Sequence, residues 1–297
     1  MKLVECVPNV SEGRDSVNVE AIAAAVRATP GVILLGVSSD PDHNRSVISY
    51  LGEPEAVLAA TVALCLEAFG RIDMRAHTGC HPRLGAVDVV PFVPLGGVSM
   101  EEAVALARRL GERLGAEGIP VYYYEDAALL PERRDLADVR RGEYEGLQER
   151  LLTDGGRPDA GPAVFNPRAG ACIVGVRKPL IAFNVNLATD RLEVADAIAR
   201  AVRLSSGGYR GVKALGVALP AKGQVQVSMN LVDYQSTPIH RVVETIRFEA
   251  ARYGVSISEC ELVGLAPLAA LEETIRYYLQ LHEFSVDQII ETHLLGS

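Results

Sequence analysis

The stretch that decides the fold is Val32–Leu51, VILLGVSSDPDHNRSVISYL, in which a polar loop separates two apolar segments. The segments at residues 32–37 and 46–51 have the apolar and β-branched character of strands, and the loop SSDPDHNR between them is rich in turn-forming residues. These features predict an antiparallel hairpin. The rest of the first half can be placed around this hairpin.

Helical and strand patterns flank the hairpin on both sides. We expect a strand at residues 3–10 and a helix around residues 19–26 before it, and a helix at residues 54–69 and a strand at residues 86–93 after it. The order is therefore βαββαβ. Further along we expect a helix opened by a capping box of Ser99 and Glu102, a strand at residues 119–124, a helix at residues 133–152 and a structureless loop at residues 153–170.

The same order of elements returns in the second half. The expected strands lie at residues 180–187, 212–219, 224–232 and 260–265, and the expected helices lie around residues 194–202, 238–246 and 271–279. Two βαββαβ units predict an α+β protein of two ferredoxin-like subdomains, each a four-stranded antiparallel sheet with helices on one face. Because helix-free sheet faces need cover, we expect the subdomains, residues 1–178 and 179–297, to face each other across a ligand cleft.

Composition limits the classes of function. The formal net charge of -9 argues against a general nucleic-acid binder and favours a small-molecule ligand. The five cysteines show no metal-ligand spacing, and no apolar run approaches the roughly 20 residues that span a bilayer. We therefore expect a reduced, cytoplasmic protein that binds neither nucleic acid nor membrane.

Chemically capable side chains are densest in RIDMRAHTGCHPRLGAVDVV, residues 71–90. They are His77, Cys80, His81, Arg83 and Asp88. Pro82 biases His81 away from helix, in a loop that leads into an apolar strand. A histidine on an anchored loop can exchange protons near neutral pH, because its unperturbed pKa is about 6.5.

Other chemistries stay open for this stretch. His77 and His81, with the aspartate and histidine side chains of the hairpin loop, form a set that could hold zinc, although no spacing is a metal signature. Cys80 could act as a thiol nucleophile, but adjacent residues of an extended chain point in opposite directions. The hairpin loop is explained structurally as an Asx-rich turn, which is compatible with Arg45 holding a carboxylate.

The segment Gly161–Gly170, GPAVFNPRAG, is rich in glycine and proline. A flexible linker would explain that composition. However, the adjacent apolar pair Val164 and Phe165 beside Arg168 also suits a flat ligand with anionic ends. No GxGxxG or P-loop pattern is present, so we expect no nucleotide site here.

At these residues the sequence resembles the formiminotransferase family, best known as the amino-terminal part of formiminotransferase-cyclodeaminase. The matching segments are VECVPNVSEGRD, DPDHNRSV, RIDMRAHTGCHPRLGAVDVVPFVPL, RRGEYEGL, GPAVFNPRAGA, RKPLIAFNVNL, QVSMNLVDY and ELVGLAPLAAL. The resemblance implies two ferredoxin-like subdomains, a homodimer and a role in histidine degradation and one-carbon metabolism. No cyclodeaminase half follows Ser297, so we expect a stand-alone transferase.

The resemblance also implies glutamate formimidoyltransferase activity. The family moves the formimino group of N-formimino-L-glutamate to nitrogen 5 of tetrahydrofolate, giving 5-formiminotetrahydrofolate and L-glutamate. Tetrahydrofolate, with or without a polyglutamate tail, is then a co-substrate, and no metal is expected. Alternatives are a formyltransferase between 5-formyltetrahydrofolate and glutamate, a metal-dependent formiminoglutamate hydrolase, and a folate-binding protein without turnover.

Site residues follow from the same resemblance. The family's catalytic histidine falls on His81, as general acid and base. Its folate-binding loop falls on Gly161, Pro162, Ala163, Val164, Phe165, Asn166, Pro167, Arg168, Ala169 and Gly170.

Supporting roles are assigned to polar residues elsewhere. Cys80 and Ser38 stand where animal members have a glutamate and an aspartate, so we expect Asp40 to orient His81 and to meet the amidinium of the substrate. The candidates for the substrate carboxylates are Arg45 and Arg83, and those for the pterin edge are Asn184, Asn186 and Asn230.

Overall fold

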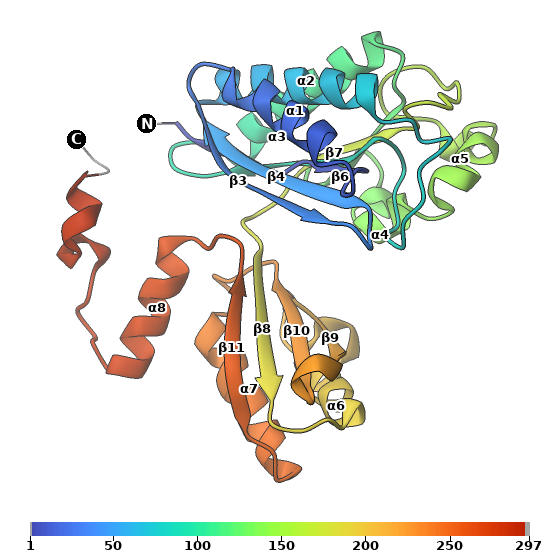
Figure 1. Ribbon diagram of the computed structural model, residues 1–297. Helices are drawn as coiled ribbons and strands as arrows, with labels where there is room; N and C mark the ends of the chain where they lie inside the picture. The colour runs from blue at the N-terminus through green and yellow to red at the C-terminus, as the bar shows by residue number, and fades with distance from the viewer. Residues whose placement is uncertain (1, 295–297) are drawn as a thin grey trace. The chain divides into compact units, whose positions relative to one another are not determined.

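The computed structural model describes residues 2–294 and divides into two compact units, Met1–Arg177 (unit 1) and Lys178–Ser297 (unit 2). Each unit combines one β-sheet with α-helices, as Figure 1 shows, and each has its own hydrophobic core. The predicted α+β class is therefore confirmed.

Unit 1 is built on a seven-stranded sheet. Its strands are β1 (Val4–Cys6), β2 (Asn9–Val10), β3 (Val32–Asp40), β4 (Arg45–Gly52), β5 (Val87–Pro94), β6 (Val121–Glu125) and β7 (Cys172–Val176). Its helices are α1 (Ser16–Arg27), α2 (Pro54–Arg71), α3 (Met100–Ala116), α4 (Leu136–Val139) and α5 (Glu143–Leu151). Across the sheet, β3 pairs with β4, β1 and β2 lie between β4 and β5, and β7 and β6 extend the sheet beyond β5.

The predicted hairpin is confirmed as β3 and β4. Side chains along β4 alternate between half-buried and buried, as expected for a strand with one face on a core. The two strands pair antiparallel up to Asp40 and Arg45, the last pair before the turn. The hairpin therefore places two charged side chains at the end of the sheet that the turn closes.

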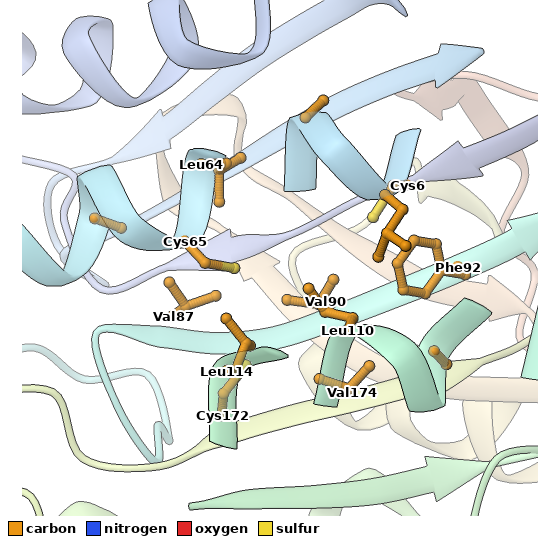
Figure 2. Close-up of a cluster of buried hydrophobic side chains, with 14 of the residues drawn as sticks. Cys6, Leu64, Cys65, Val87, Val90, Phe92, Leu110, Leu114, Cys172 and Val174 are labelled. Carbon is orange, nitrogen blue, oxygen red and sulfur yellow. The ribbon is translucent and has the colours of Figure 1, made fainter. Parts of the chain in front are cut away.

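The main core of unit 1 lies between α1, α2, α3 and one face of the sheet. Figure 2 shows Leu110 and Leu114 of α3 together with Phe92 of β5 in this buried cluster. Every residue of β5 from Val87 to Val93 is buried, because α4 and α5 cover the opposite face of β5, β7 and β6 with a second cluster. The predicted capping box of Ser99 and Glu102 is present at the start of α3.

Unit 2 repeats the βαββαβ order. Its strands are β8 (Ile181–Leu187), β9 (Val212–Leu219), β10 (Gln224–Leu231) and β11 (Ile257–Val263), and its helices are α6 (Leu192–Val202), α7 (Ile239–Arg252) and α8 (Leu268–Leu279). The order across the sheet is β11-β8-β10-β9, and all three pairings are antiparallel. The buried side chains of α6 and α7 belong to one cluster with those of the sheet. The predicted four-stranded antiparallel sheet is confirmed for this unit.

The same expectation is wrong for unit 1, whose sheet is larger and mixed. The short buried segment Cys172–Val176, which we did not predict as a strand, pairs parallel with both β5 and β6. Its apolar run includes Gly175, where an added Cβ would lie 2.2 Å from a ring carbon of Tyr124. A five-residue run interrupted by glycine gives a weak local strand signal, and its partners lie far away in sequence.

The single helix predicted at residues 133–152 is also wrong. The chain breaks into α4 and α5, and Gly142 between them has a left-handed φ of 84°. This break allows the backbone N–H of Tyr144 to bond the carbonyl of Arg83 at 2.9 Å. The segment at residues 153–170, predicted as a loop, contains no α-helix and no strand, only a short 3-10 turn at Asp154–Gly156. Within residues 2–294, no helix is long and apolar enough to cross a membrane.

The core of unit 1 leads to a stability prediction. Leu110 is fully buried in α3, whereas Leu152 at the end of α5 is 86% exposed. Leu110→Ala should lower the free energy of unfolding by about 2–5 kcal/mol, because a buried cavity adds to the lost transfer energy. Leu152→Ala, the matched control, should change it by about 0.5 kcal/mol or less. Urea denaturation of both variants measures the difference, and equal effects would contradict the assigned core.

Candidate active site

The loop that carries His81 is fixed to the β3–β4 turn by Asn44. Asn44 is buried, with a left-handed φ of 48°, and its side-chain amide donates to the carbonyl of Thr78 at 3.0 Å. Its side-chain oxygen accepts the N–H of Gly13 at 3.0 Å, and its backbone carbonyl contacts Nε2 of His77 at 3.1 Å. One residue therefore joins three segments that are far apart in sequence.

Close backbone packing completes this junction. A Cβ at Gly79 would lie 2.4 Å from the carbonyl oxygen of His43, and a Cβ at Gly13 would lie 2.4 Å from that of Asp40. Only glycine allows the backbones to approach so closely. The approach brings His81 beside the first residue of β4.

That residue, Arg45, makes the main contact of His81. A guanidinium nitrogen, Nη1, lies 2.5 Å from Nε2 of the imidazole. Because a guanidinium can only donate, Nε2 is the acceptor, and the neutral ring carries its proton on Nδ1. His81 is thus placed as a base whose accepting nitrogen faces a cation.

The surroundings lower the pKa of His81 to about 4. The largest cause is the partial burial of the ring, followed by the positive charges of Arg45 and Arg140. A backbone hydrogen bond with Pro82 raises the pKa and so opposes these effects. The imidazole is therefore neutral at pH 7. Since the unfolded chain takes up this proton near pH 6.5, the contribution of His81 to stability is lost as pH falls from about 6.5 to about 4.

Arg140 is a site residue that the sequence interpretation missed. It forms an ion pair with Asp88, which is buried and also accepts the N–H of Leu84 at 2.8 Å. Burial raises the pKa of Asp88, against the positive charges of Arg140 and Arg45. The buried Nε of Arg140 has no partner among the described residues. The only signal for this role was that RRGEYEGL, which includes Arg140, matched the family pattern.

Asp40, the predicted orienting residue of His81, contacts another histidine. Its Oδ2 lies 2.5 Å from Nδ1 of His43, and its Oδ1 accepts the backbone N–H groups of Asp42 and His43. These hydrogen bonds lower the pKa of Asp40, so the group is a carboxylate at neutral pH. The geometry therefore favours His43, and not His81, as the ring that Asp40 orients.

Arg83 and His77 have structural partners. The nearly buried guanidinium of Arg83 is paired with Glu143 at 3.0 Å and Glu145 at 2.6 Å, and its Nε donates to Nδ1 of His77 at 3.3 Å. As Arg83 already has two carboxylate partners, the geometry favours Arg45 over Arg83 as a ligand for substrate. These groups line a cavity of about 550 Å³ between the histidine loop and the first turn of α5.

The predicted folate-binding loop lies against the same stretch. The carbonyl of Arg168 accepts the N–H of Met74 at 2.9 Å, and the guanidinium of Arg168 donates to the last carbonyls of α2. The ring of Phe165 lies 5.5 Å from that of Tyr144, whose hydroxyl donates to the carbonyl of Pro167 at 2.6 Å. Val164 is 67% exposed, so an apolar side chain of this loop is accessible.

The predicted pterin-binding asparagines lie on the strands of unit 2. The amide of Asn184 donates to Glu261 and that of Asn186 to Glu259, at 3.0 and 3.1 Å. Asn230 on β10 is exposed. All three belong to one polar face of this sheet, because side chains alternate along β8 and β10.

The structure also describes the residues of the thiol and metal alternatives. Cys80 is exposed, and its thiol donates to the carbonyl of Asp42 at 3.5 Å. All five cysteines, which fall within residues 2–294, are free. Among the side chains that the structure describes, no group of three or more from histidine, cysteine and acidic residues could hold a metal ion.

Known proteins resemble this chain over nearly its full length. Residues 3–177 match the family model described as formiminotransferase domain, N-terminal subdomain, and residues 182–294 match that of the formiminotransferase domain. A glutamate formimidoyltransferase of Streptococcus pyogenes serotype M1 is 46% identical over 297 residues, or 99% of each chain. One of Thermoplasma acidophilum is 49% identical over 294 residues, 98% of this chain and 97% of that one. The formimidoyltransferase-cyclodeaminase of Rattus norvegicus is 43% identical over 93% of this chain and 52% of its own length.

These matches, which cover both units of the chain, define an enzyme of the transferase class. More particularly, the chain belongs to the formiminotransferase family. The resemblance inferred from the sequence motifs is thereby confirmed.

The charge around His81 gives a titration prediction. Arg45→Gln should raise the pKa of His81 by about one unit, because the substitution removes a positive charge next to the ring. Arg14→Gln removes a charge from a neighbouring segment that does not contact His81, and it should leave that pKa unchanged. NMR titration of the imidazole nitrogens measures both, and equal pKa values in the two variants would contradict the assigned contact.

Proposed function

We propose that this protein is a glutamate formimidoyltransferase, which moves the formimino group of N-formimino-L-glutamate to nitrogen 5 of tetrahydrofolate, with His81 as general base. The observation that carries the proposal is the neutral imidazole of His81 held beside Arg45 in a chain of this family. The relatives that match almost end to end are glutamate formimidoyltransferases, which supports the same reaction.

The reaction needs a proton to leave one nitrogen and another to arrive elsewhere. Nitrogen 5 attacks the amidine carbon, and the tetrahedral intermediate collapses once nitrogen 5 loses a proton and the departing glutamate amine gains one. A base that is neutral at pH 7 can accept the first proton, and general acid–base catalysis of this kind contributes about 10²- to 10⁴-fold. His81 meets this requirement, since its pKa of about 4 keeps the ring unprotonated.

Arg45 gives the site its affinity for a substrate carboxylate, whereas Arg140 is already paired with the buried Asp88. The positive charges of Arg45 and Arg140 lower the pKa of His81. They also oppose the rise in the pKa of Asp88 that burial causes. A guanidinium binds a carboxylate through two parallel hydrogen bonds. When Arg45 turns to a substrate carboxylate, Nε2 of His81 is released from its cation and becomes free to accept the substrate proton.

Folate recognition is assigned to the loop Gly161–Gly170 and to unit 2. The exposed Val164 and the ring of Phe165 offer apolar surface for a pterin, and the loop is fixed to the histidine stretch through Met74. Asn184, Asn186 and Asn230 are assigned to the pterin edge. Asn230 is exposed, whereas the amides of Asn184 and Asn186 donate to Glu261 and Glu259.

We further propose that each of the two units is a ferredoxin-like subdomain. The shared order of strands and helices supports this assignment. In unit 1, β1 and β2 lie between β4 and β5, and in unit 2, β8 lies between β10 and β11. We also propose a cytoplasmic homodimer that works without a metal in histidine degradation. The free cysteines fit a reducing compartment.

The reaction class is tested by assaying glutamate release with and without tetrahydrofolate, before and after chelation. The proposed transferase releases glutamate only with tetrahydrofolate, and a chelator has no effect. Folate-independent release that a chelator abolishes would show a hydrolase. A formyltransferase would instead use 5-formyltetrahydrofolate and glutamate in preference to the formimino substrates.

The role of His81 has its own test. His81→Ala should lower kcat by about two orders of magnitude or more and leave tetrahydrofolate binding largely intact, because the base is lost and the folate loop is not. The matched control is His282→Ala, at an exposed position of unit 2, which should retain normal turnover. Steady-state kinetics and folate titration separate the two effects, and near-normal kcat in His81→Ala would contradict the assignment.

A further inference from the structure

A second histidine lies next to His81. The ring centroids of His43 and His81 are 6.0 Å apart, and the ring planes are inclined at 73°. The two rings come from different segments, the β3–β4 turn and the loop before β5. We propose that His43 is a second catalytic residue, which protonates the departing glutamate amine while His81 accepts the proton of the attacking nitrogen. This inference rests on the proposed function.

The contact with Asp40 orients His43 for this task. Oδ2 of Asp40 lies 2.5 Å from Nδ1 of His43, while Oδ1 is fixed by the backbone N–H groups of Asp42 and His43 at 2.9 and 3.0 Å. Because the carboxylate accepts, Nδ1 carries a proton and the opposite nitrogen, Nε2, is the one left for a substrate. An aspartate, a histidine and a substrate nitrogen in this order form the usual arrangement of an oriented proton donor.

His81 is poorly suited to be the only proton carrier. Its Nε2 faces the guanidinium of Arg45, and burial together with positive charge disfavours the imidazolium. His43 has a different environment, because its ring contacts a carboxylate and is more exposed. Two titratable groups in contrasting environments are the pattern expected of a separate base and acid.

The proton balance of the step is complete with two histidines. The bond between nitrogen 5 and the amidine carbon forms, and the proton of nitrogen 5 passes to His81. The bond from that carbon to the glutamate nitrogen breaks as His43, which takes up a proton from water on Nε2 before the step, gives that proton to this nitrogen. The step leaves His81 protonated and His43 neutral, and because both rings are partly exposed, exchange with water restores their starting states.

Two neighbouring side chains, those of Arg14 and Cys80, donate hydrogen bonds to backbone carbonyls of the turn. Arg14 donates to the carbonyl of Pro41 at 2.8 Å, and the thiol of Cys80 donates to the carbonyl of Asp42. The side chains of Asp40 and His81 both contact the His43 ring. Asp42 is exposed and lies in the same turn as His43, so removing its side-chain charge provides a matched control.

The test compares two donors in the full-length protein. With N-formimino-L-glutamate, His43→Gln should lower kcat by about 10-fold or more, since an alkyl amine must be protonated to leave. With a formimino donor whose leaving group is a nitro-substituted aromatic amine, which is a much weaker base and needs less proton donation to depart, the loss should shrink to about 3-fold or less. Asp42→Asn should match the wild type with both donors.

Each outcome decides between the hypotheses. If the wild type does not transfer the formimino group to tetrahydrofolate, the proposed function fails. If the wild type is active and His43→Gln stays within about 3-fold of it, or loses equally with both donors, His43 is not the acid. Circular dichroism and tetrahydrofolate binding verify that the variant is folded, and His43→Asn replaces it if it is not.

Discussion

The site depends on one buried amide, the side chain of Asn44. Its oxygen and nitrogen satisfy the N–H of Gly13 and the carbonyl of Thr78, which would otherwise be unpaired polar groups within the junction. Asparagine tolerates the left-handed conformation that this position adopts, and it supplies both a donor and an acceptor. Leucine would provide neither, and aspartate would lack the donor. The distance between His81 and Arg45 is therefore a consequence of a hydrogen-bonded junction that lies outside the reacting groups.

The sequence predicted the parts of this architecture that local patterns determine. The β3–β4 hairpin, the capping box at Ser99 and the four-stranded sheet of unit 2 agree with the structure, because alternation, turn residues and caps act within a few positions. The parallel pairing of β7 and the break at Gly142 were missed, since a distant partner and a left-handed glycine decide them. Local sequence patterns carry no information on packing between segments that are far apart in the chain.

The candidate site shows the same limit. The density of reactive groups identified the histidine stretch, but the partners of each group come from other segments of the chain. Arg140 reaches Asp88 across 52 positions, and Arg83 reaches Glu145 across 62. Sequence reasoning could name Arg45 and Arg83 as equal candidates for a carboxylate. Only the folded structure shows that Arg83 already has two acidic partners, whereas Arg45 contacts a histidine.

Arg45 connects binding to basicity in a way that either role alone does not explain. In the free protein its charge lowers the pKa of His81 and its N–H occupies the accepting nitrogen, so the base is weak and blocked. A carboxylate that pairs with Arg45 both neutralises this charge and removes this donor, and each effect strengthens the base. Under the proposed roles of Arg45 and His81, the substrate increases the basicity of the histidine that its own reaction requires. A site of this kind spends little time protonated without substrate, because burial and Arg45 together disfavour the imidazolium until an anion arrives.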